Sequence, residues 1–340
     1  MSEKIIKLGM DIGNKNLKVC GEDGVPHEIP VAYEISNKFD YESEPHDSIE
    51  RIFYNEVYYV VGLQCTQGLP QNKSDIDFRE IATMFKLVGL ARELRRLSET
   101  KGEFYVVTGT PVEDFDQFQE GYKDLMLSKN NEYEKIEMNG IEYSIKVSKT
   151  NITKQSACVA PILPNWKEDD FIIVDLGGGT LDLAYFQRGI KERYHTMNFS
   201  LNRILEELGN VLNVYDLGIK RPNAQDSGFI RTMEEIVLDG LYKTKPFIVV
   251  KGEHRELKQF CSEWLQVKVD SVVRDIKVGL NLSATDSQLT QVYYIGGGSK
   301  LLAEMLAKNT GFLKKKVLDQ PHFMNVILYH KIATVIDWEW

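Results

Sequence analysis

One stretch near the middle of the chain, residues 171–184, restricts the possible folds more than any other. It reads FIIVDLGGGTLDLA: four apolar residues, an aspartate, three glycines and a second apolar run. Such runs predict two buried strands, and consecutive glycines suit the tight turn between them. The turn presents backbone N–H groups with no side chains to block a phosphate. We therefore expect a β-hairpin with Asp175 at the end of its first strand and a phosphate site at 177–180.

The same design occurs near the start of the chain. Residues 8–18 read LGMDIGNKNLK: a strand, Asp11, Gly13, a polar turn and an apolar return. A single glycine-rich turn is equally typical of an ordinary hairpin with a solvated aspartate, so its recurrence is the stronger signal. Two strand–Asp–Gly hairpins predict two related halves that close on one polyphosphate.

A third glycine cluster lies at residues 292–302, VYYIGGGSKLL. Here an apolar strand leads through Gly296, Gly297 and Gly298 into a helix expected from Ser299 to Lys308. The backbone at such a junction can pass close to a flat ring or a phosphate. The spacing is not G-x-G-x-x-G, and G-x-x-x-x-G-K-[ST] does not occur, which argues against Rossmann and P-loop folds.

Composition narrows the class of protein. The 340 residues suit two domains, and 43% hydrophobic with 27% charged residues is typical of a soluble globular protein. No apolar run reaches the roughly 20 residues that span a bilayer, and the N-terminus does not resemble a secretory signal. Four scattered cysteines fit a reducing cytoplasm and no zinc site. The net charge of −9 argues against direct binding to DNA, so contact with DNA would run through a basic partner.

Hydrophobic periodicity predicts the order of elements. Three short strands are expected over 5–35, followed by an acidic surface loop at 37–50. A strand pair should turn at Asn55-Glu56, and a hairpin at Asn139-Gly140. Helices are expected over 78–97 (capped by Asp75 or Asp77), 118–126, 155–163, 200–213, 228–241, 255–280 and 322–334, and a strand over 103–110. We place the domain boundary near residue 164. Two tryptophans, Trp338 and Trp340, are costly to expose, so they either pack on the first domain or dock to a partner.

The motifs in this order resemble the phosphate-1, connect-1, phosphate-2 and adenosine motifs of the actin superfamily, which includes actin, sugar kinases and heat-shock chaperone ATPases. Within it, the chain most resembles bacterial actin-like plasmid-segregation ATPases of the ParM type, on its length, its VTGTPV at 107–112 and its DLGGGTLD at 175–182. The resemblance implies an α/β actin-like ATPase fold with two ribonuclease-H-like domains flanking a nucleotide cleft. Domain I would comprise 1–164 with a helix at 320–340 returning to it, and domain II 165–319.

The resemblance also implies roles for individual residues. Asp11 and Asp175 would hold Mg²⁺ and be catalytic, and Gln155 would orient the attacking water. Connect 2, expected as Asn325 followed by a small residue and a glycine, is bulkier here. The nucleotide-binding residues implied are Gly13, Asn14, Lys15, Asn16, Lys18, Gly177, Gly178, Gly179, Thr180, Gly296, Gly297, Gly298 and Ser299. Phosphoryl transfer needs such a combination of N–H donors, a divalent cation and a group that places the nucleophile.

The expected function is therefore that of a cytoplasmic ATPase that polymerises with ATP–Mg²⁺, with GTP left open as the nucleotide. Hydrolysis would destabilise the filament, and a DNA-binding adaptor would link the filament to plasmid DNA. A small-molecule kinase of the same superfamily is the first alternative, although no stretch of sequence typical of a sugar-binding site is evident. A chaperone-like ATPase is the second, although nothing after the ATPase core would hold a peptide. A membrane partner is not expected, because residues 332–340 are too short and acidic for an amphipathic anchor.

Overall fold

The computed structural model of the protein describes residues 4–37, 49–62, 65, 67, 76–111, 115–197, 199–212, 223–224, 226–239, 247–250 and 253–338. The chain divides into two compact units. Unit 1 comprises Met1–Thr110, Asp114–Lys154 and Asn325–Trp340, and unit 2 comprises Pro111–Glu113 and Gln155–Met324. The main division thus precedes the boundary expected near residue 164. Most of the acidic loop at 37–50, the Asp75 cap, the side chain of Asp77, and Trp340 lie outside the described residues.

Unit 1 is built on a mixed sheet of nine strands in the order β3-β2-β1-β7-β9-β8-β5-β6-β4. The strands are β1 (Ile5–Ile12), β2 (Asn16–Cys20), β3 (Pro26–Pro30), β4 (Tyr33–Ser36), β5 (Ile49–Tyr54), β6 (Val57–Gly62), β7 (Lys101–Thr110), β8 (Glu134–Met138) and β9 (Ile141–Lys154). The hairpins β5–β6 and β8–β9 turn at Asn55-Glu56 and Asn139-Gly140, as expected, and all four residues have positive φ. Asparagine and glycine adopt this conformation readily, so the Asn139-Gly140 turn is decided locally. Glu56 does not favour it, and the pairing of Tyr54 with Val57 holds the β5–β6 turn.

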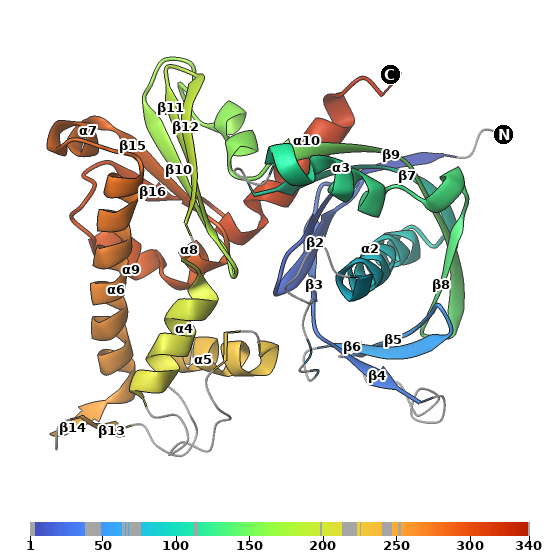
Figure 1. Ribbon diagram of the computed structural model, residues 1–340, viewed down its shortest axis with the longest axis horizontal. Helices are drawn as coiled ribbons and strands as arrows, with labels where there is room; N and C mark the ends of the chain where they lie inside the picture. The colour runs from blue at the N-terminus through green and yellow to red at the C-terminus, as the bar shows by residue number, and fades with distance from the viewer. Residues whose placement is uncertain are drawn as a thin grey trace. The chain divides into compact units, whose positions relative to one another are not determined.

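Helix α2 (Ile76–Arg96) lies inside the curled sheet of unit 1, with strands on several sides of it (Figure 1). The expected apolar stripe is buried, but so is Lys86, which is only 1% exposed. Its Nζ lies 2.9 Å from Oε2 of Glu134 on β8, a partner that a buried charge requires. Burial lowers the pKa of Lys86, and Glu134 opposes that shift. The other helices of unit 1 are α3 (Phe115–Met126), η1 (Lys129–Asn131) and α10 (Met324–Val335).

Different helices cover the two faces of β1. A Cβ on Gly89 of α2 would lie 3.2 Å from Met10 Cε, so α2 packs on the Met10 face. A Cβ on Gly9 would lie 2.4 Å from the carbonyl oxygen of Val326 and 2.5 Å from the backbone nitrogen of His330, both on α10. Adjacent residues of a strand point to opposite faces. Helix α10 therefore contacts the backbone of β1 at a position where only glycine fits.

The C-terminal segment packs on unit 1. The rings of Trp338 and Tyr105, on β7, have centroids 5.0 Å apart. The indole Nε1 of Trp338 donates to the carbonyl oxygen of Ala333 at 2.9 Å, and Lys149 on β9 donates to the carbonyl oxygen of Trp338. Of the two alternatives for the C-terminal tryptophans, packing on the first unit therefore holds for Trp338.

Unit 2 contains a five-stranded sheet in the order β12-β11-β10-β15-β16. Its strands are β10 (Phe171–Leu176), β11 (Leu181–Gln187), β12 (Ile190–Met197), β15 (Gln291–Ile295) and β16 (Lys315–Val317); β13 (Phe247–Val250) and β14 (Glu253–Glu256) form a separate hairpin. β10 pairs antiparallel with β11, as the sequence predicts, and parallel to β15. Ile172, Val174 and Leu176 face the helical core, so Asp175 points to the opposite face of the sheet.

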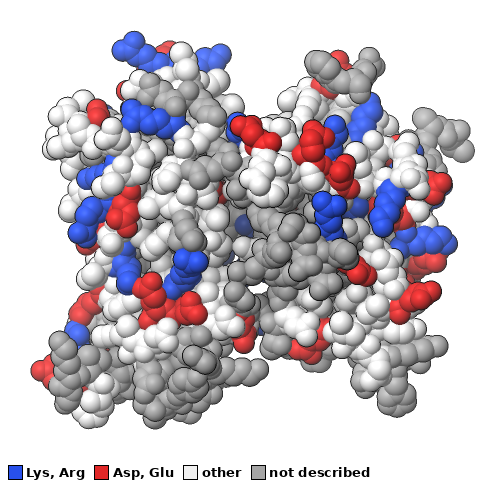
Figure 2. Space-filling model, viewed as in Figure 1, with Lys and Arg blue, Asp and Glu red and all other residues white. Residues whose placement is uncertain are grey.

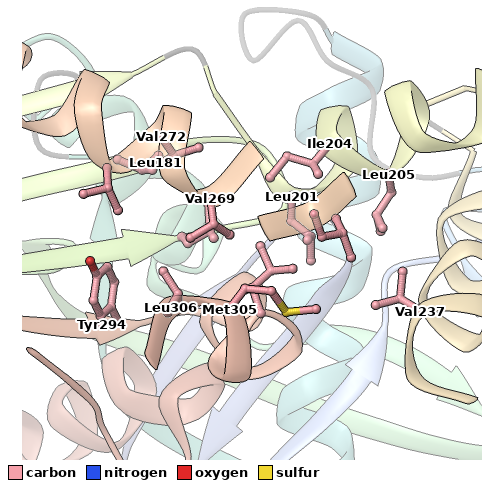
Figure 3. Packing of buried hydrophobic residues seen from close by; sticks show 14 of the residues in the cluster. Leu181, Leu201, Ile204, Leu205, Val237, Val269, Val272, Tyr294, Met305 and Leu306 are labelled. Carbon is pink, nitrogen blue, oxygen red and sulfur yellow. The ribbon is translucent and has the colours of Figure 1, made fainter. Parts of the chain in front are cut away.

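Four helices contribute buried residues to the core on the apolar face of this second sheet: α4 (Leu201–Val211), α5 (Ser227–Asp239), α6 (Leu257–Gly279) and α9 (Ala303–Lys308). The other helical segments of unit 2 are η2 (Ala157–Ile162), α7 (Ala284–Leu289), α8 (Gly297–Leu301) and η4 (Pro321–Phe323). Figure 3 shows Val269 and Val272 of α6 close to Leu181 of β11, within one buried cluster that also includes Leu201 of α4 and Leu306 of α9. None of the described helices is long and apolar enough to cross a membrane.

Two helices of unit 2 differ from expectation. The helix expected over 155–163 is the 3₁₀ segment η2, which contains Pro161 and follows Ser156, whose φ is 58°. Proline lacks an N–H donor and so disfavours a regular α-helix here. The helix expected from Ser299 to Lys308 begins earlier, at Gly297, and is divided at Leu302 into α8 and α9. The short elements β13, β14, β16 and α7 carry too little periodic pattern to be predicted.

Candidate functional site

The first candidate element is the hairpin of β1 and β2. Asp11 near the end of β1 is 7% exposed and is paired in register with Lys18 on β2. The Nζ of Lys18 lies 3.7 Å from Oδ2 of Asp11, so the structure brings these two predicted site residues together. The N–H of Gly13 donates to the carbonyl oxygen of Asn16 at 3.2 Å and closes the turn.

The polar residues of this first turn have different environments. The side-chain Nδ2 of Asn16 donates to Glu28 Oε2 on β3 at 2.9 Å, and the carbonyl oxygen of Lys15 accepts from the N–H of Val31 at 2.7 Å. Both bonds tie the turn to the edge of the sheet. Asn14 is exposed at the tip. The turn is thus anchored on one side and presents Asn14 to solvent.

The second candidate element is the hairpin of β10 and β11. Asp175 is 6% exposed, and the N–H of Gly177 donates to the carbonyl oxygen of Thr180 at 2.9 Å to close the turn. The carbonyl oxygens of Gly177 and Gly178 accept from the N–H groups of Leu201 and Asn202 at 3.1 and 3.3 Å. The start of α4 therefore holds the peptide planes of the predicted phosphate turn, which is the preorganisation that an anion site requires.

Asp182 is a functional candidate that the sequence analysis missed. It is 2% exposed and lies opposite Asp175 in the β10–β11 register, so both carboxylates are on one face of the sheet. Thr180 Oγ1 donates to Asp182 Oδ2 at 3.1 Å, and Thr196 Oγ1 donates to Oδ1 at 2.5 Å. The sequence could have predicted the position of Asp182, because a hairpin turn over 177–180 pairs residue 176 with 181 and residue 175 with 182.

The third glycine cluster lies beside the second hairpin. A Cβ on Gly296, whose φ is 89°, would lie 2.4 Å from Oδ1 of Asp175, and a Cβ on Gly298 would lie 2.5 Å from Leu176 Cγ. These two glycines therefore permit close packing against β10. A Cβ on Gly297 would have no heavy atom of the described part of the chain within 4 Å, which leaves this position open to a ligand. Ser299 is fully buried and its hydroxyl donates to the carbonyl oxygen of Ile295, so that hydroxyl is used within the protein.

The predicted catalytic residue Gln155 follows β9 directly and begins unit 2. Its side chain is half-buried, and its carbonyl oxygen accepts from Ala157 N at 2.5 Å and from Ser156 Oγ at 2.6 Å. It is therefore in a tight turn rather than at the first turn of a helix. Asp11 and Lys18 belong to unit 1, whereas Gln155, Asp175 and the cluster at 296–298 belong to unit 2.

Connect 2 differs from the expected pattern in a way the structure explains. Asn325 is 9% exposed near the start of α10 and is followed by Val326 where the family pattern has a small residue. The carbonyl oxygen of Val326 nevertheless comes within 2.4 Å of the position of a Gly9 Cβ. The glycine that permits close approach is therefore on the strand, which allows bulkier residues on the helix.

Each hairpin carries one buried aspartate of the type that binds a divalent cation in nucleotide sites. No cluster of three or more His, Cys, Asp or Glu that could hold a metal occurs among the described residues. Mg²⁺ in nucleotide sites typically uses one or two carboxylates and keeps several waters, so Asp11 in unit 1 and Asp175 in unit 2 are each suitable ligands in kind. On the face in Figure 2, acidic and basic side chains are interspersed, so the net charge of −9 forms no large acidic patch there.

Comparison with known proteins identifies the family. Residues 9–157 match the family described as the N-terminal domain of actin like proteins, and residues 170–325 match the Alp7A C-terminal domain. The chain belongs to the actin-like proteins. No characterised protein sequence matches it in a direct comparison.

Solved structures share the fold of this actin-like chain. The apo ParM protein of psk41 is 14% identical, with a TM-score of 0.66 and 97% of each chain covered. Ta0583, an archaeal actin homolog in complex with ADP, is 14% identical with a TM-score of 0.70, and 97% of this chain and 99% of that chain are covered. The Alp12 filament structure is 14% identical, with a TM-score of 0.62 and coverage of 97% and 98%. Because these structures are only 14% identical to the chain, their similarity establishes the fold alone, which is the two-domain actin fold.

Proposed function

We propose that this protein is an ATPase that assembles into filaments with ATP–Mg²⁺ and moves plasmid DNA through a DNA-binding adaptor protein. The observation that carries the proposal is the pair of hairpins, each with a buried aspartate near the end of its first strand, in a chain of this family. The ADP complex of Ta0583 and the filament of Alp12, both of the same fold, support nucleotide binding and self-association.

The proposed roles follow from the geometry of each hairpin. The turn at 177–180, held on α4, would bind phosphate oxygens with backbone N–H groups. Lys18 would add a positive charge beside Asp11, and Asp11 and Asp175 would hold Mg²⁺, directly or through its waters. When bound, Mg²⁺ neutralises charge that develops on the phosphate oxygens. Gln155 would orient the attacking water, because an amide can accept and donate hydrogen bonds without being a strong base.

Filament formation is tested by light scattering and electron microscopy of the purified protein with ATP–Mg²⁺, with ADP–Mg²⁺, with ATP and EDTA, and without nucleotide. We expect polymer with ATP–Mg²⁺ and a specific ATPase activity that rises above a threshold protein concentration, where scattering also appears. Modest salt should lower this threshold, since it screens repulsion between subunits of charge −9. Activity strictly proportional to protein concentration, without sedimenting polymer, would contradict the filament and favour a kinase, whose turnover depends on an added acceptor.

The adaptor is tested separately. The acidic chain should not retard plasmid DNA in a gel at physiological salt, with or without ATP–Mg²⁺, because phosphate contacts require a basic surface. A basic DNA-binding protein that recruits the filaments to plasmid DNA in fluorescence microscopy would be the adaptor. Tight DNA binding by the filament alone would argue against an adaptor.

A further inference from the structure

We infer that Asn202 is a specificity-determining residue that accepts a hydrogen bond from a ribose hydroxyl of the bound nucleotide. This inference rests on the proposed nucleotide binding and names a contact to the sugar that the sequence motifs do not include. Asn202 is at the start of α4, beside the turn at 177–180, and its backbone N–H donates to the carbonyl oxygen of Gly178 at 3.3 Å. Its side chain is thus fixed next to the predicted phosphate turn.

The amide of Asn202 has one satisfied and one unsatisfied end. Its Nδ2 donates to the carbonyl oxygen of Ala224 at 3.1 Å, which assigns the nitrogen to that side. The Oδ1 is shielded from solvent and has no hydrogen-bond partner among the residues that the structure describes. A buried acceptor without a partner costs free energy, and such atoms in native proteins call for an explanation such as a bound ligand or water.

The chemistry of the missing partner follows from Oδ1 being an acceptor. Phosphate oxygens of a nucleotide accept hydrogen bonds and therefore cannot satisfy it. In a nucleotide whose phosphates lie on the turn, the next group along the molecule is the ribose, whose 2′- and 3′-hydroxyls are donors. The ribose is thus the nearest part of the ligand that can supply the hydrogen bond.

Gly178 brings the turn and the Asn202 amide into close contact. A Cβ at Gly178 would lie 3.3 Å from Oδ1 of Asn202 and 3.7 Å from its Cγ and Nδ2. A larger residue at 178 would therefore displace the amide from its place against the turn. The second glycine of the triplet thus holds the acceptor Oδ1 directly beside the predicted phosphate turn.

The test measures the affinity of the full-length protein for ATP–Mg²⁺, 2′-deoxy-ATP–Mg²⁺ and 3′-deoxy-ATP–Mg²⁺ by calorimetry. The wild type should bind at least one deoxy analogue roughly 5- to 50-fold more weakly than ATP, because Oδ1 then stays unpaired. Asn202→Ala should bind ATP and that analogue with a ratio near one. Asn202→Asp keeps an acceptor oxygen and should retain the discrimination, although its negative charge weakens binding of every triphosphate.

Ser200→Ala is the matched control for a purely structural effect. The hydroxyl of Ser200 caps the same helix start by accepting from the N–H of Arg203 at 3.3 Å, so its loss perturbs α4 while the ATP-to-deoxy-ATP ratio should stay as in the wild type. An Asn202→Ala protein that loses affinity for ATP and both analogues by the same factor would overturn the ribose contact. So would discrimination against inosine triphosphate alone, which would assign Oδ1 to the base amine.

The two proposals fail in different ways. A wild type that binds no ATP–Mg²⁺ would defeat the proposed function and this contact with it. A wild type that binds ATP–Mg²⁺ but does not distinguish either deoxy analogue would defeat only the ribose contact.

Discussion

The two strand–Asp–Gly hairpins look alike in sequence but differ in what stands opposite the aspartate. In the first hairpin the cross-strand partner of Asp11 is Lys18, with Nζ and Oδ2 3.7 Å apart. In the second hairpin the cross-strand partner of Asp175 is Asp182, itself a buried carboxylate. The first hairpin therefore provides its own cation, whereas the second presents two carboxylates on one face.

This difference predicts which of the two hairpins contributes more to Mg²⁺ binding. A carboxylate beside an ammonium gains less from an added cation than a carboxylate beside another carboxylate, because like charges raise the benefit of a counter-ion. The two threonine hydroxyls that donate to Asp182 satisfy its oxygens but carry no charge. We therefore expect the Mg²⁺ dependence of this protein to be dominated by the second hairpin.

The largest expected effect separates the two hairpins directly. Asp175→Asn should reduce ATP turnover by roughly 10³-fold and remove the Mg²⁺ dependence of nucleotide binding, because it removes a charge from the acidic hairpin. Asp11→Asn should have a smaller effect, since the first hairpin keeps the positive charge of Lys18. Both are measured by steady-state ATPase assays over a Mg²⁺ titration. Asp170→Asn, an exposed neighbour of β10, is the control for the loss of one charge. Equal losses of ATP turnover in Asp175→Asn and Asp11→Asn would contradict the expectation that the second hairpin dominates the Mg²⁺ dependence.

The next effect tests a residue outside both hairpins. Gln155→Ala should slow hydrolysis by about 10²-fold while ATP affinity stays nearly unchanged, because a group that orients water acts mainly in the transition state. Single-turnover hydrolysis and nucleotide binding measured on the same protein separate these quantities, and filaments should persist longer. Gln259→Ala on the surface of α6 is the matched amide control. Parallel loss of binding and hydrolysis would mark Gln155 as a residue that only maintains the turn after β9.

A smaller effect tests the internal cation of the first hairpin. Lys18→Met should weaken ATP binding roughly tenfold, since it removes the charge-assisted contact to phosphate that we propose for Lys18. It should also lower the free energy of unfolding by about 1–3 kcal/mol, because the buried Asp11 carboxylate then loses its neighbouring cation. Calorimetric titration and urea unfolding measure the two quantities. Lys4→Met removes the same charge from the exposed Lys4–Glu22 pair and should leave affinity unchanged. A large loss of stability with normal affinity would make Lys18 a structural residue.

The smallest effect is the loss of folding stability at acid pH. We expect it to be larger in unit 1 than in unit 2. Burial and the nearby Arg96 and Arg92 lower the pKa of His27 on β3 to about 4, and Arg96 Nη1 lies 2.9 Å from its Nδ1, which must accept. The folded state therefore holds neutral histidine, so stability is full above the unfolded pKa and falls as the pH drops from about 6.5 towards 4. At pH 5 the loss should be roughly 1–2 kcal/mol.

Hydrogen exchange at pH 7 and pH 5 locates this effect. Protection in β2 and β3 of unit 1 should fall more than protection in β10 and β11 of unit 2. His27→Gln removes the titrating group, so the extra loss of protection in β2 and β3 at pH 5 should disappear. An unchanged pH dependence in that variant would assign the acid sensitivity to other groups.

Much of the fold could be read from local sequence. Both aspartate hairpins, the Asn139-Gly140 turn and helix α2 rest on periodicity and on residues that adopt positive φ, which act over a few neighbouring positions. The failures have local causes too. Pro161 makes η2 a 3₁₀ segment, and the expected helix over 299–308 is split at Leu302.

The sequence by itself thus determined where each aspartate, each glycine turn and each long helix lies along the chain. Only the tertiary structure decided what they meet: Asp182 opposite Asp175, Gly296 against the Asp175 carboxylate, and Gly9 under α10. It also decided the burial of Lys86 with Glu134, although a lysine within a helix normally predicts a solvated position. The physical reason is that propensity and periodicity act between near neighbours, whereas strand register and close backbone approach depend on packing between residues far apart in the chain.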